Sequence, residues 1–142
     1  MTLYVMDTDH LSLYERGYSA IRDRIFAVQQ NTDDALFITV ISVEEQFAGR
    51  LAQIRKATTP QNLISAYKYL RNTFVLFSDL EILDYDTRAD ERFREFRKTG
   101  LHIGTRDLRI AAISLVNAGI LLTRNSRDFE KVPGLMIQDW SI

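Results

Sequence analysis

Five short apolar runs alternate with longer stretches in which apolar residues recur every three or four positions, and this alternation constrains the fold most strongly. The short runs predict strands at Leu3–Met6, Leu36–Ile41, Glu81–Tyr85, Ile120–Thr123 and Leu135–Gln138. The longer patterns predict helices at Ser19–Gln30, Val43–Lys56, Leu63–Phe77, Asp90–Lys98 and Asp107–Val116. Strands that alternate with helices form a mainly parallel sheet covered on both faces. We therefore predict a three-layer α/β/α fold with roughly five strands.

The composition fits one globular domain and narrows the available chemistry. The chain has 142 residues, 46% of them hydrophobic, and no repeat or linker divides it, so we expect a single domain over residues 1–142. The absence of cysteine excludes disulfides, thiolate metal ligands and a cysteine nucleophile. The formal net charge is -1, so any binding of nucleic acid must depend on local clusters of positive charge.

Targeting signals are not apparent in the sequence. No basic segment followed by an apolar one opens the chain, and no run of about 18 apolar residues occurs. We therefore expect no signal peptide, no membrane span and a cytoplasmic location.

Asp7 is the first of several acids that follow predicted strands. In parallel α/β sheets, ligands bind at the carboxyl ends of the strands, so residues there are candidates for a functional site. Asp7 directly follows the strand Leu3–Met6 and is followed by Thr8 and Asp9. The alternative is that Asp7 or Thr8 only caps the helix that begins near His10, a role that Asp fills well.

The helix after the second predicted strand begins with two acids, Glu44 and Glu45. Successive helical residues point about 100° apart, so we expect only one of the two to reach a shared pocket. Glu45 is favoured because it lies off the apolar face and beside Gly49, where another helix could approach closely. The alternative is a capping box, in which Glu45 accepts a hydrogen bond from the backbone N–H of Ser42.

Asp107 precedes the nearly all-apolar segment Leu108–Val116, which indicates a buried helix with an acid at its mouth. Thr105 is the expected N-cap of this helix. The helix dipole alone would also favour an acid in the first turn.

Asp128 lies in the loop after the fourth predicted strand, again at a carboxyl end, with Asn125 and Ser126 as caps for a short turn. A solvated aspartate paired with Arg124 or Arg127 explains this position equally well.

Asp86 and the two histidines do not support a site of another kind. Asp86 has the context of an ordinary helix N-cap. His10 and His102 lack the paired spacing of a zinc-binding helix, which argues against a histidine-ligated metal.

Four segments together resemble the PIN-domain ribonucleases, most closely the VapC-type toxins of prokaryotic toxin–antitoxin pairs. The segments are Tyr4–Asp9, Ile41–Gly49, Asp107–Ala112 and Leu122–Phe129. Their order and spacing carry the resemblance, which covers essentially the whole chain. One departure is Asp9, where such proteins commonly carry Asn.

The resemblance implies a PIN-like fold and assigns roles to individual residues. It implies that four acids are catalytic and bind metal: Asp7, Glu45, Asp107 and Asp128. It implies supporting polar roles for Thr8, Asp9, Thr123 and Asn125. Asn125 also stands where some relatives carry the fourth acid, so it either replaces or assists Asp128.

A cluster of carboxylates needs a compensating cation, because close negative charges raise one another's pKa values. Mg²⁺ and Mn²⁺ fit best, since they prefer oxygen ligands. With such an ion we expect hydrolysis of RNA by water, and products with 5′-phosphate and 3′-hydroxyl ends. The sequence does not distinguish one ion from two.

Arginines provide the candidate contacts to RNA phosphates: Arg88, Arg92, Arg106 and Arg109. The alternative for this set is a solvated helix face.

The leading interpretation is a metal-dependent endoribonuclease that cleaves structured RNA, tRNA or rRNA, as the toxin of a type II toxin–antitoxin pair. The resemblance then implies a small antitoxin partner and a homodimer, to which Leu11, Leu13, Tyr14, Tyr67, Tyr69 and Leu70 could contribute apolar surface. The alternative for these residues is the core, where such side chains are found more often. One alternative is a non-catalytic module that binds RNA or protein, in which the acids serve as helix caps. Another is a PIN nuclease in RNA processing, outside a toxin pair.

Overall fold

The computed structural model describes residues 1–31 and 33–142. Within these residues, five strands form one parallel sheet in the order β3-β2-β1-β4-β5. Their bounds are β1 Thr2–Met6, β2 Asp34–Thr39, β3 Glu81–Leu83, β4 Ile120–Leu122 and β5 Met136–Gln138. The predicted parallel sheet is therefore confirmed. Its order changes direction at β1, because the chain runs outward to β2 and β3 on one side and returns to β4 and β5 on the other.

Helices connect the strands and differ from the predictions mainly at their ends. Their bounds are α1 Thr8–Glu15, α2 Ser19–Gln30, α3 Val40–Lys56, α4 Pro60–Ser78, α5 Thr87–Lys98, α6 Thr105–Val116 and α7 Ser126–Phe129. α3 begins at Val40 and not at Val43, because the Thr39 hydroxyl accepts a hydrogen bond from the Ser42 N–H and caps the helix. The predicted strand Leu36–Ile41 accordingly ends at Thr39.

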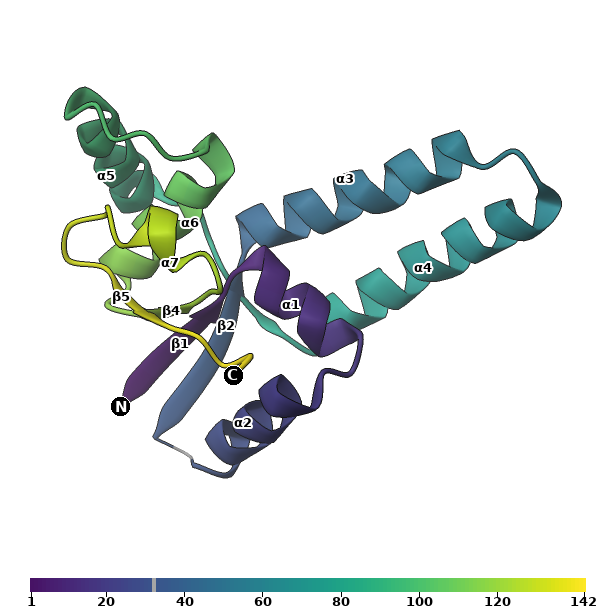
Figure 1. Ribbon diagram of the computed structural model, residues 1–142, viewed down its shortest axis with the longest axis horizontal. Coiled ribbons are helices and arrows are strands. Elements are labelled where there is room, and N and C mark those ends of the chain that lie inside the picture. Colours follow the sequence, from purple (N-terminus) through teal and green to yellow (C-terminus); the bar gives the residue numbers. More distant parts are fainter. Residues whose placement is uncertain (32) are drawn as a thin grey trace.

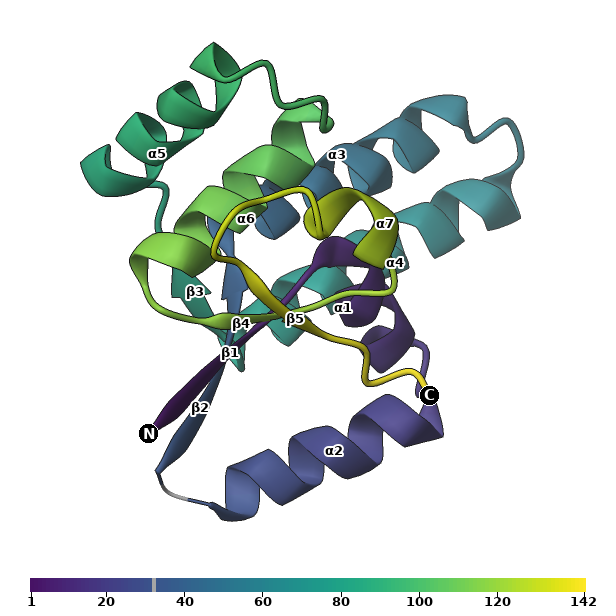
Figure 2. The same cartoon turned by 60° about the vertical axis from the view of Figure 1, so that its left-hand side comes forward.

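Two hydrophobic cores lie on opposite faces of the sheet and give the molecule its three layers (Figure 2). Successive residues of a strand point to opposite faces, so Val5 and Met6 at the end of β1 enter different cores. Val5 packs in the core that α5 and α6 cover, and Met6 packs in the core that α1, α2 and α4 cover. Both side chains are fully buried, so the strand end that precedes Asp7 is held from both sides.

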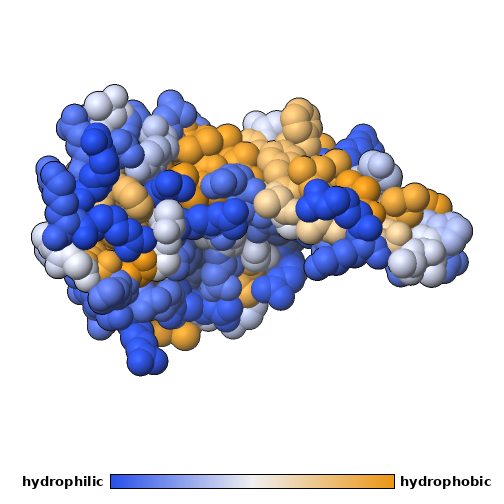
Figure 3. Space-filling model, turned by 90° about the horizontal axis from the view of Figure 1, so that it is seen from above, coloured by the Kyte–Doolittle hydropathy of each residue, from blue (hydrophilic) through white to orange (hydrophobic). Residues whose placement is uncertain are grey.

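α3 and α4 form a hairpin that projects from the sheet (Figure 1). Seen from above, apolar residues gather on the exposed surface of this hairpin (Figure 3). Large apolar side chains are exposed along both of its helices. They include Leu51, Ile64, Tyr67 and Phe74. Leu11 and Leu13, by contrast, are core residues, so the expectation that they contribute apolar surface to a dimer is wrong.

Gly49 lies on this hairpin and does not serve the purpose expected from the sequence. A Cβ built at Gly49 would meet nothing within 4 Å. No close helix approach therefore depends on this glycine. Across the described part of the chain, no helix combines the length and apolar character needed to cross a bilayer.

Candidate metal centre

The carboxyl end of β1 opens into a pocket of about 320 Å³ lined mainly by polar side chains. The lining residues are Asp7, Thr8, Asp9, Glu45, Asp107, Asn125 and Phe129. They come from the start of α1, from α3, from α6 and from the segment after β4. Three of the four acids singled out in the sequence thus share one pocket, where the strand order changes direction.

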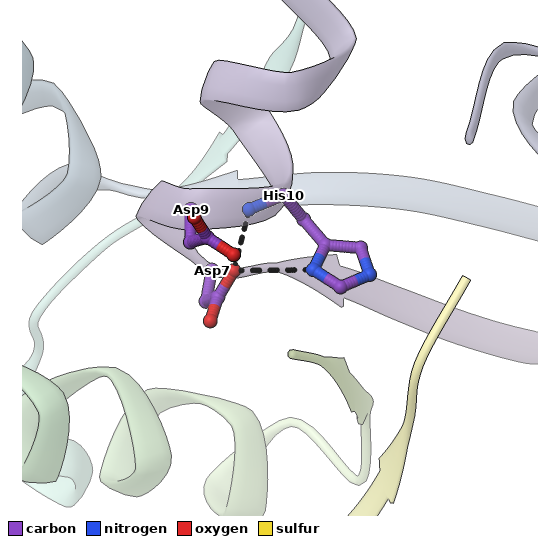
Figure 4. A group of neighbouring side chains, drawn as sticks. All are labelled: Asp7, Asp9 and His10. Atoms are coloured by element: carbon purple, nitrogen blue, oxygen red, sulfur yellow. Dashed lines mark hydrogen bonds and ion pairs between the residues drawn. The ribbon is translucent and has the colours of Figure 1, made fainter. Parts of the chain in front are cut away.

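Asp7 is 5% exposed and combines the two roles that the sequence left as alternatives. Its Oδ1 accepts a hydrogen bond from the His10 N–H at 2.7 Å and caps α1. No hydrogen bond to Oδ2 is found among the described residues, and this oxygen points away from the His10 ring (Figure 4). Asp7 therefore caps the helix with one oxygen and keeps the other available to a ligand.

Glu45 is held by a chain of hydroxyl groups. The Thr8 Oγ1 donates to Glu45 Oε1 at 3.1 Å and lies 3.0 Å from Ser42 Oγ. A hydroxyl has one hydrogen, so Ser42 donates to Thr8 while Thr8 donates to Glu45. The capping-box alternative for Glu45 is wrong, because Thr39 caps α3 and Glu45 lies beyond its first turn.

Burial raises the pKa of the Glu45 carboxyl above its ordinary value. The hydrogen bond from Thr8 and the charge of Arg106 lower this pKa, whereas the charges of Glu44 and Asp7 raise it further. The net direction is upward, so ionised Glu45 is under electrostatic strain in the absence of a cation.

Asp107 is the pocket acid whose pKa is shifted furthest from its ordinary value. It is half-buried in the first turn of α6. Its pKa is raised to about 6, first by burial and then by the charges of Glu45, Asp7 and Asp128. The N-cap of α6 is Gly104, which has no side chain, so the expected cap by Thr105 is not formed.

Asp128 stands apart from the three pocket acids. It does not belong to the pocket lining, whereas Asn125 does. Asn125 Nδ2 donates to Asp128 Oδ2 at 3.1 Å, and Lys131 Nζ lies 3.5 Å from Asp128 Oδ1. These contacts, chiefly the one with Asn125, lower the pKa of Asp128. Thr123 is buried and its hydroxyl accepts from the Asn125 N–H at 2.9 Å, which fixes the start of this turn.

Asp9 lines the pocket, but its charge is already partnered. Arg124 Nε and Nη2 donate to the two oxygens of Asp9 at 2.6 and 2.9 Å. The sequence suggested Arg124 as a partner of Asp128, and the structure pairs it with Asp9 instead. Asp9 is therefore less available to a cation than Asp7, Glu45 or Asp107.

His10 lacks the paired spacing of a zinc-binding histidine, yet its ring adjoins the site. Its ring is fully buried, with Nδ1 3.5 Å from Asp7 Oδ1. Asp7, Asp9 and His10 each offer one ligand atom within 4.8 Å of the others (Figure 4). The signal in the sequence is its spacing, since His10 follows Asp7 by one helical turn.

The donor set of the pocket fits a hard divalent cation. Carboxylate oxygens from Asp7, Glu45 and Asp107 are the ligand type that Mg²⁺ and Mn²⁺ prefer, and Asn125 adds an amide. Burial first, and then the charges of the neighbouring acids, raise the pKa values of Glu45 and Asp107, and a bound cation would offset both effects.

The candidate RNA-binding arginines are mostly engaged elsewhere, and none lines the pocket. Arg88 pairs with Asp86, and Arg92 lies 3.5 Å from Glu95. Arg106 is exposed, with its Nε 3.9 Å from Glu44 Oε1. The charge of Arg106 nevertheless reaches the pocket, because it lowers the pKa of Glu45.

Arg109 has the environment of a packing residue. Its guanidinium lies over the rings of Tyr85 and Phe93, at 5.7 and 5.2 Å from their centroids. Its Nε is buried and, within residues 1–31 and 33–142, has no hydrogen-bond partner. A side chain held this way between two aromatic rings is poorly placed to reach a phosphate.

Comparison with curated proteins finds relatives over part of the chain. A tRNA(fMet)-specific endonuclease VapC of Salmonella typhimurium is 37% identical over 67 residues, which is 44% of this chain and 51% of that protein. Ribonuclease VapC2 of Rickettsia felis is 31% identical over 70 residues, which is 46% of this chain and 52% of that protein. The matches thus span about half the length of these curated relatives. No family model matches the chain.

Solved structures match over nearly the whole chain. A chain of VapBC2 from Rickettsia felis, bound to a promoter DNA fragment, has a TM-score of 0.79 at 20% identity and covers 98% of this chain and 99% of that one. A chain of DNA-bound VapBC from Salmonella typhimurium has a TM-score of 0.67 at 27% identity, with 99% of each chain covered. The protein therefore shares its fold with chains of VapBC structures, and the resemblance to the VapC-type proteins is confirmed.

Proposed function

We propose that this protein is a metal-dependent endoribonuclease that hydrolyses phosphodiester bonds of structured RNA, with tRNA as its substrate, and acts as the toxin of a type II toxin–antitoxin pair. The observation that carries the proposal is the meeting of Asp7, Glu45 and Asp107 in one pocket at the carboxyl end of the sheet. The names of the two relatives, an endonuclease specific for tRNA(fMet) and a ribonuclease, support the choice of reaction and substrate.

The proposed cation is Mg²⁺ or Mn²⁺, held by Asp7, Glu45 and Asp107, with Asp128 acting through its charge and through Asn125. Such an ion supplies Lewis-acid stabilisation of the negative charge that develops on the phosphate during hydrolysis. The side chains of the protein prepare this site before the ion arrives. Thr8 orients Glu45, and the capping bond from His10 fixes Oδ1 of Asp7.

Cleavage by site variants tests this proposal directly. The purified protein should cut a tRNA pool in Mg²⁺ and lose this activity in excess EDTA. Asp7→Asn and Asp107→Asn should each abolish cleavage, because each removes a charge from the pocket. The matched control is Asp86→Asn, since Asp86 also caps a helix, through the Ala89 N–H at 3.0 Å, but does not line the pocket.

Loss of activity in all three variants would point to a general effect of losing an acid at the N-terminal end of a helix. If the unaltered protein itself binds RNA but does not cleave it, a non-catalytic module would be favoured.

We further propose a small antitoxin as partner and a homodimer in the absence of RNA. Chains from VapBC complexes and from a member of the VapBC family of toxin–antitoxin systems share the fold. The exposed apolar side chains on α3 and α4 support burial against a second chain, since monomeric proteins rarely expose large apolar patches.

Light scattering should give twice the mass of 16.5 kDa for the protein alone. Phe74→Asp, at a position that is 66% exposed, should reduce that mass without unfolding the chain if the hairpin forms the interface.

A further inference from the structure

His10 lies between the metal centre and the segment that follows β5. Its side chain is 0% exposed, and its two ring nitrogens face different parts of the chain. Nε2 accepts a hydrogen bond from the backbone N–H of Trp140 at 3.1 Å, a contact between residues 130 positions apart. Nδ1 lies 3.5 Å from Oδ1 of Asp7.

The bond from Trp140 determines which nitrogen of His10 carries the proton. A neutral imidazole has one N–H, and the nitrogen that accepts a hydrogen bond is the one without it. Because Nε2 accepts, the proton is on Nδ1, which faces Asp7. Among the described residues, this Nδ1 has no hydrogen-bond partner, and Asp7 Oδ1, at 3.5 Å, is the carboxylate oxygen that it faces. Because a buried donor without a partner is costly, the interaction with the Asp7 carboxylate is the one that offsets the burial of this N–H.

Trp140 is well placed to hold the ring. It is 2% exposed, its indole lies against the ring of Tyr4 at 4.9 Å between centroids, and its Nε1 donates to Gln138 Oε1 at 3.0 Å. Tyr4 belongs to β1, the strand that leads directly to Asp7. The indole and the backbone N–H of Trp140 thus contact β1 and α1 on both sides of Asp7.

Asp139 is a weaker candidate for the group that fixes the ring. Its Oδ1 lies 3.6 Å from Nε2 of His10. That oxygen already accepts hydrogen bonds from the Ser141 N–H at 2.8 Å and from the Ser141 hydroxyl at 2.6 Å. The shorter and directed contact is the one from Trp140.

We propose that His10 is a positioning residue for the metal centre, in which the backbone N–H of Trp140 fixes the Nδ1–H tautomer and this N–H orients Asp7. The proposal rests on the proposed role of Asp7 as a metal ligand. Oδ1 of Asp7 then accepts the hydrogen bond from the His10 backbone N–H and faces the ring N–H at 3.5 Å, which leaves Oδ2 for the cation. Groups that orient metal ligands in this way typically change metal affinity by 10–100-fold when they are removed.

Two amide substitutions separate the two contacts of the ring. Asn places its side-chain N–H₂ near the position of Nδ1, so His10→Asn keeps a donor toward Asp7. Gln places its polar end near the position of Nε2, so His10→Gln keeps an acceptor for Trp140 and loses the donor. We expect His10→Gln to weaken Mn²⁺ binding by roughly 10–100-fold in calorimetric titration, and His10→Asn to weaken it clearly less.

The metal-free protein offers a readout that requires neither activity nor metal. Nitrogen-15 NMR of histidine-labelled protein should show His10 with a protonated Nδ1 and an unprotonated Nε2. The chain has two histidines, and His102→Gln removes the signals of the other, exposed one. Equal stability of His10→Asn and His10→Gln in urea would exclude unfolding as the cause of a difference in affinity.

Several outcomes would overturn the positioning role. One is a protonated Nε2, and another is equal Mn²⁺ affinity in the Gln and Asn variants. A third is direct coupling of the imidazole nitrogen to bound Mn²⁺ in pulsed EPR, which would make His10 a ligand. If the unaltered protein binds Mn²⁺ and Asp7→Asn does not, failure of the His10 variants leaves the proposed site intact. If the unaltered protein binds no Mn²⁺, the proposed metal centre itself fails.

Discussion

Replacing Asp107 by Asn should stabilise the metal-free protein at neutral pH. The pKa of Asp107 is raised from 3.8 to about 6, and each pKa unit corresponds to about 1.36 kcal/mol. A shift of roughly two units would represent about 3 kcal/mol for a fully buried group. Asp107 is only half-buried, so solvent screening reduces the expected gain to about 1–2 kcal/mol.

The pH dependence of this gain follows from the direction of the shift. A carboxyl whose folded pKa lies above its unfolded value contributes stability below the unfolded value, and this contribution is lost as the pH rises through the folded value. The free energy of unfolding of the unaltered protein should therefore fall, relative to that of Asp107→Asn, between about pH 4 and about pH 7. The two proteins should have similar stability at the acid end, where Asp107 is protonated.

Urea unfolding in EDTA, repeated across this pH range, measures the difference between the two proteins. Asp86→Asn serves as the control, because the pKa of Asp86 is lowered, mainly by the hydrogen bond from Ala89, and its loss should bring no gain at neutral pH. A constant difference between Asp107→Asn and the unaltered protein at all pH values would refute the reasoning. So would a variant that is less stable at neutral pH. Saturating Mn²⁺ should make the unaltered protein more stable than Asp107→Asn. A ligand at about 100 times its Kd adds roughly 2.7 kcal/mol to the free energy of unfolding of the protein that binds it.

Further variants test the remaining contacts. Asp7→Asn should fold with unchanged or slightly higher metal-free stability, because Asn also caps helices, and a loss of folding would assign Asp7 a purely structural role. Thr8→Val should raise the pKa of Glu45 further by removing its hydrogen bond. As the pH is lowered, Mn²⁺ binding by this variant should therefore begin to weaken at a higher pH than binding by the unaltered protein, and an identical pH profile would refute this. Arg106→Glu should weaken RNA binding and reduce its salt slope by about one if the guanidinium contacts phosphate, whereas Arg109→Glu should chiefly lower stability in urea.

The sheet and two of the site acids, Asp7 and Asp107, were predictable because they depend on local patterns. Apolar runs bounded by polar residues indicate strands, and an acid directly after such a run, as at Asp7, lies at the end of the sheet where ligands bind. Asp107 was identified in a similar way, from the apolar helix that follows it. Glu45 needed the family resemblance, because the sequence allowed a capping box as well.

The interactions that were missed join residues far apart in the sequence. The pair of Arg124 with Asp9 spans 115 positions, and the contact of Trp140 with His10 spans 130. Neither has a periodic signal, because each depends on how β1, β4 and β5 lie beside one another. The start of α3 was misplaced for a local reason, since the apolar residues Val40 and Ile41 continue the strand pattern while Thr39 already caps the helix.

The ends of the RNA fragments test the central claim most directly. Fragments released from tRNA in Mg²⁺ should carry 5′-phosphate and 3′-hydroxyl groups, as expected when water and not the 2′-hydroxyl of the RNA attacks phosphorus. No fragments should form in EDTA or with Asp7→Asn. Fragments that end in 2′,3′-cyclic phosphate, or cleavage that persists in EDTA, would contradict the proposed metal-dependent hydrolysis by this cluster of carboxylates.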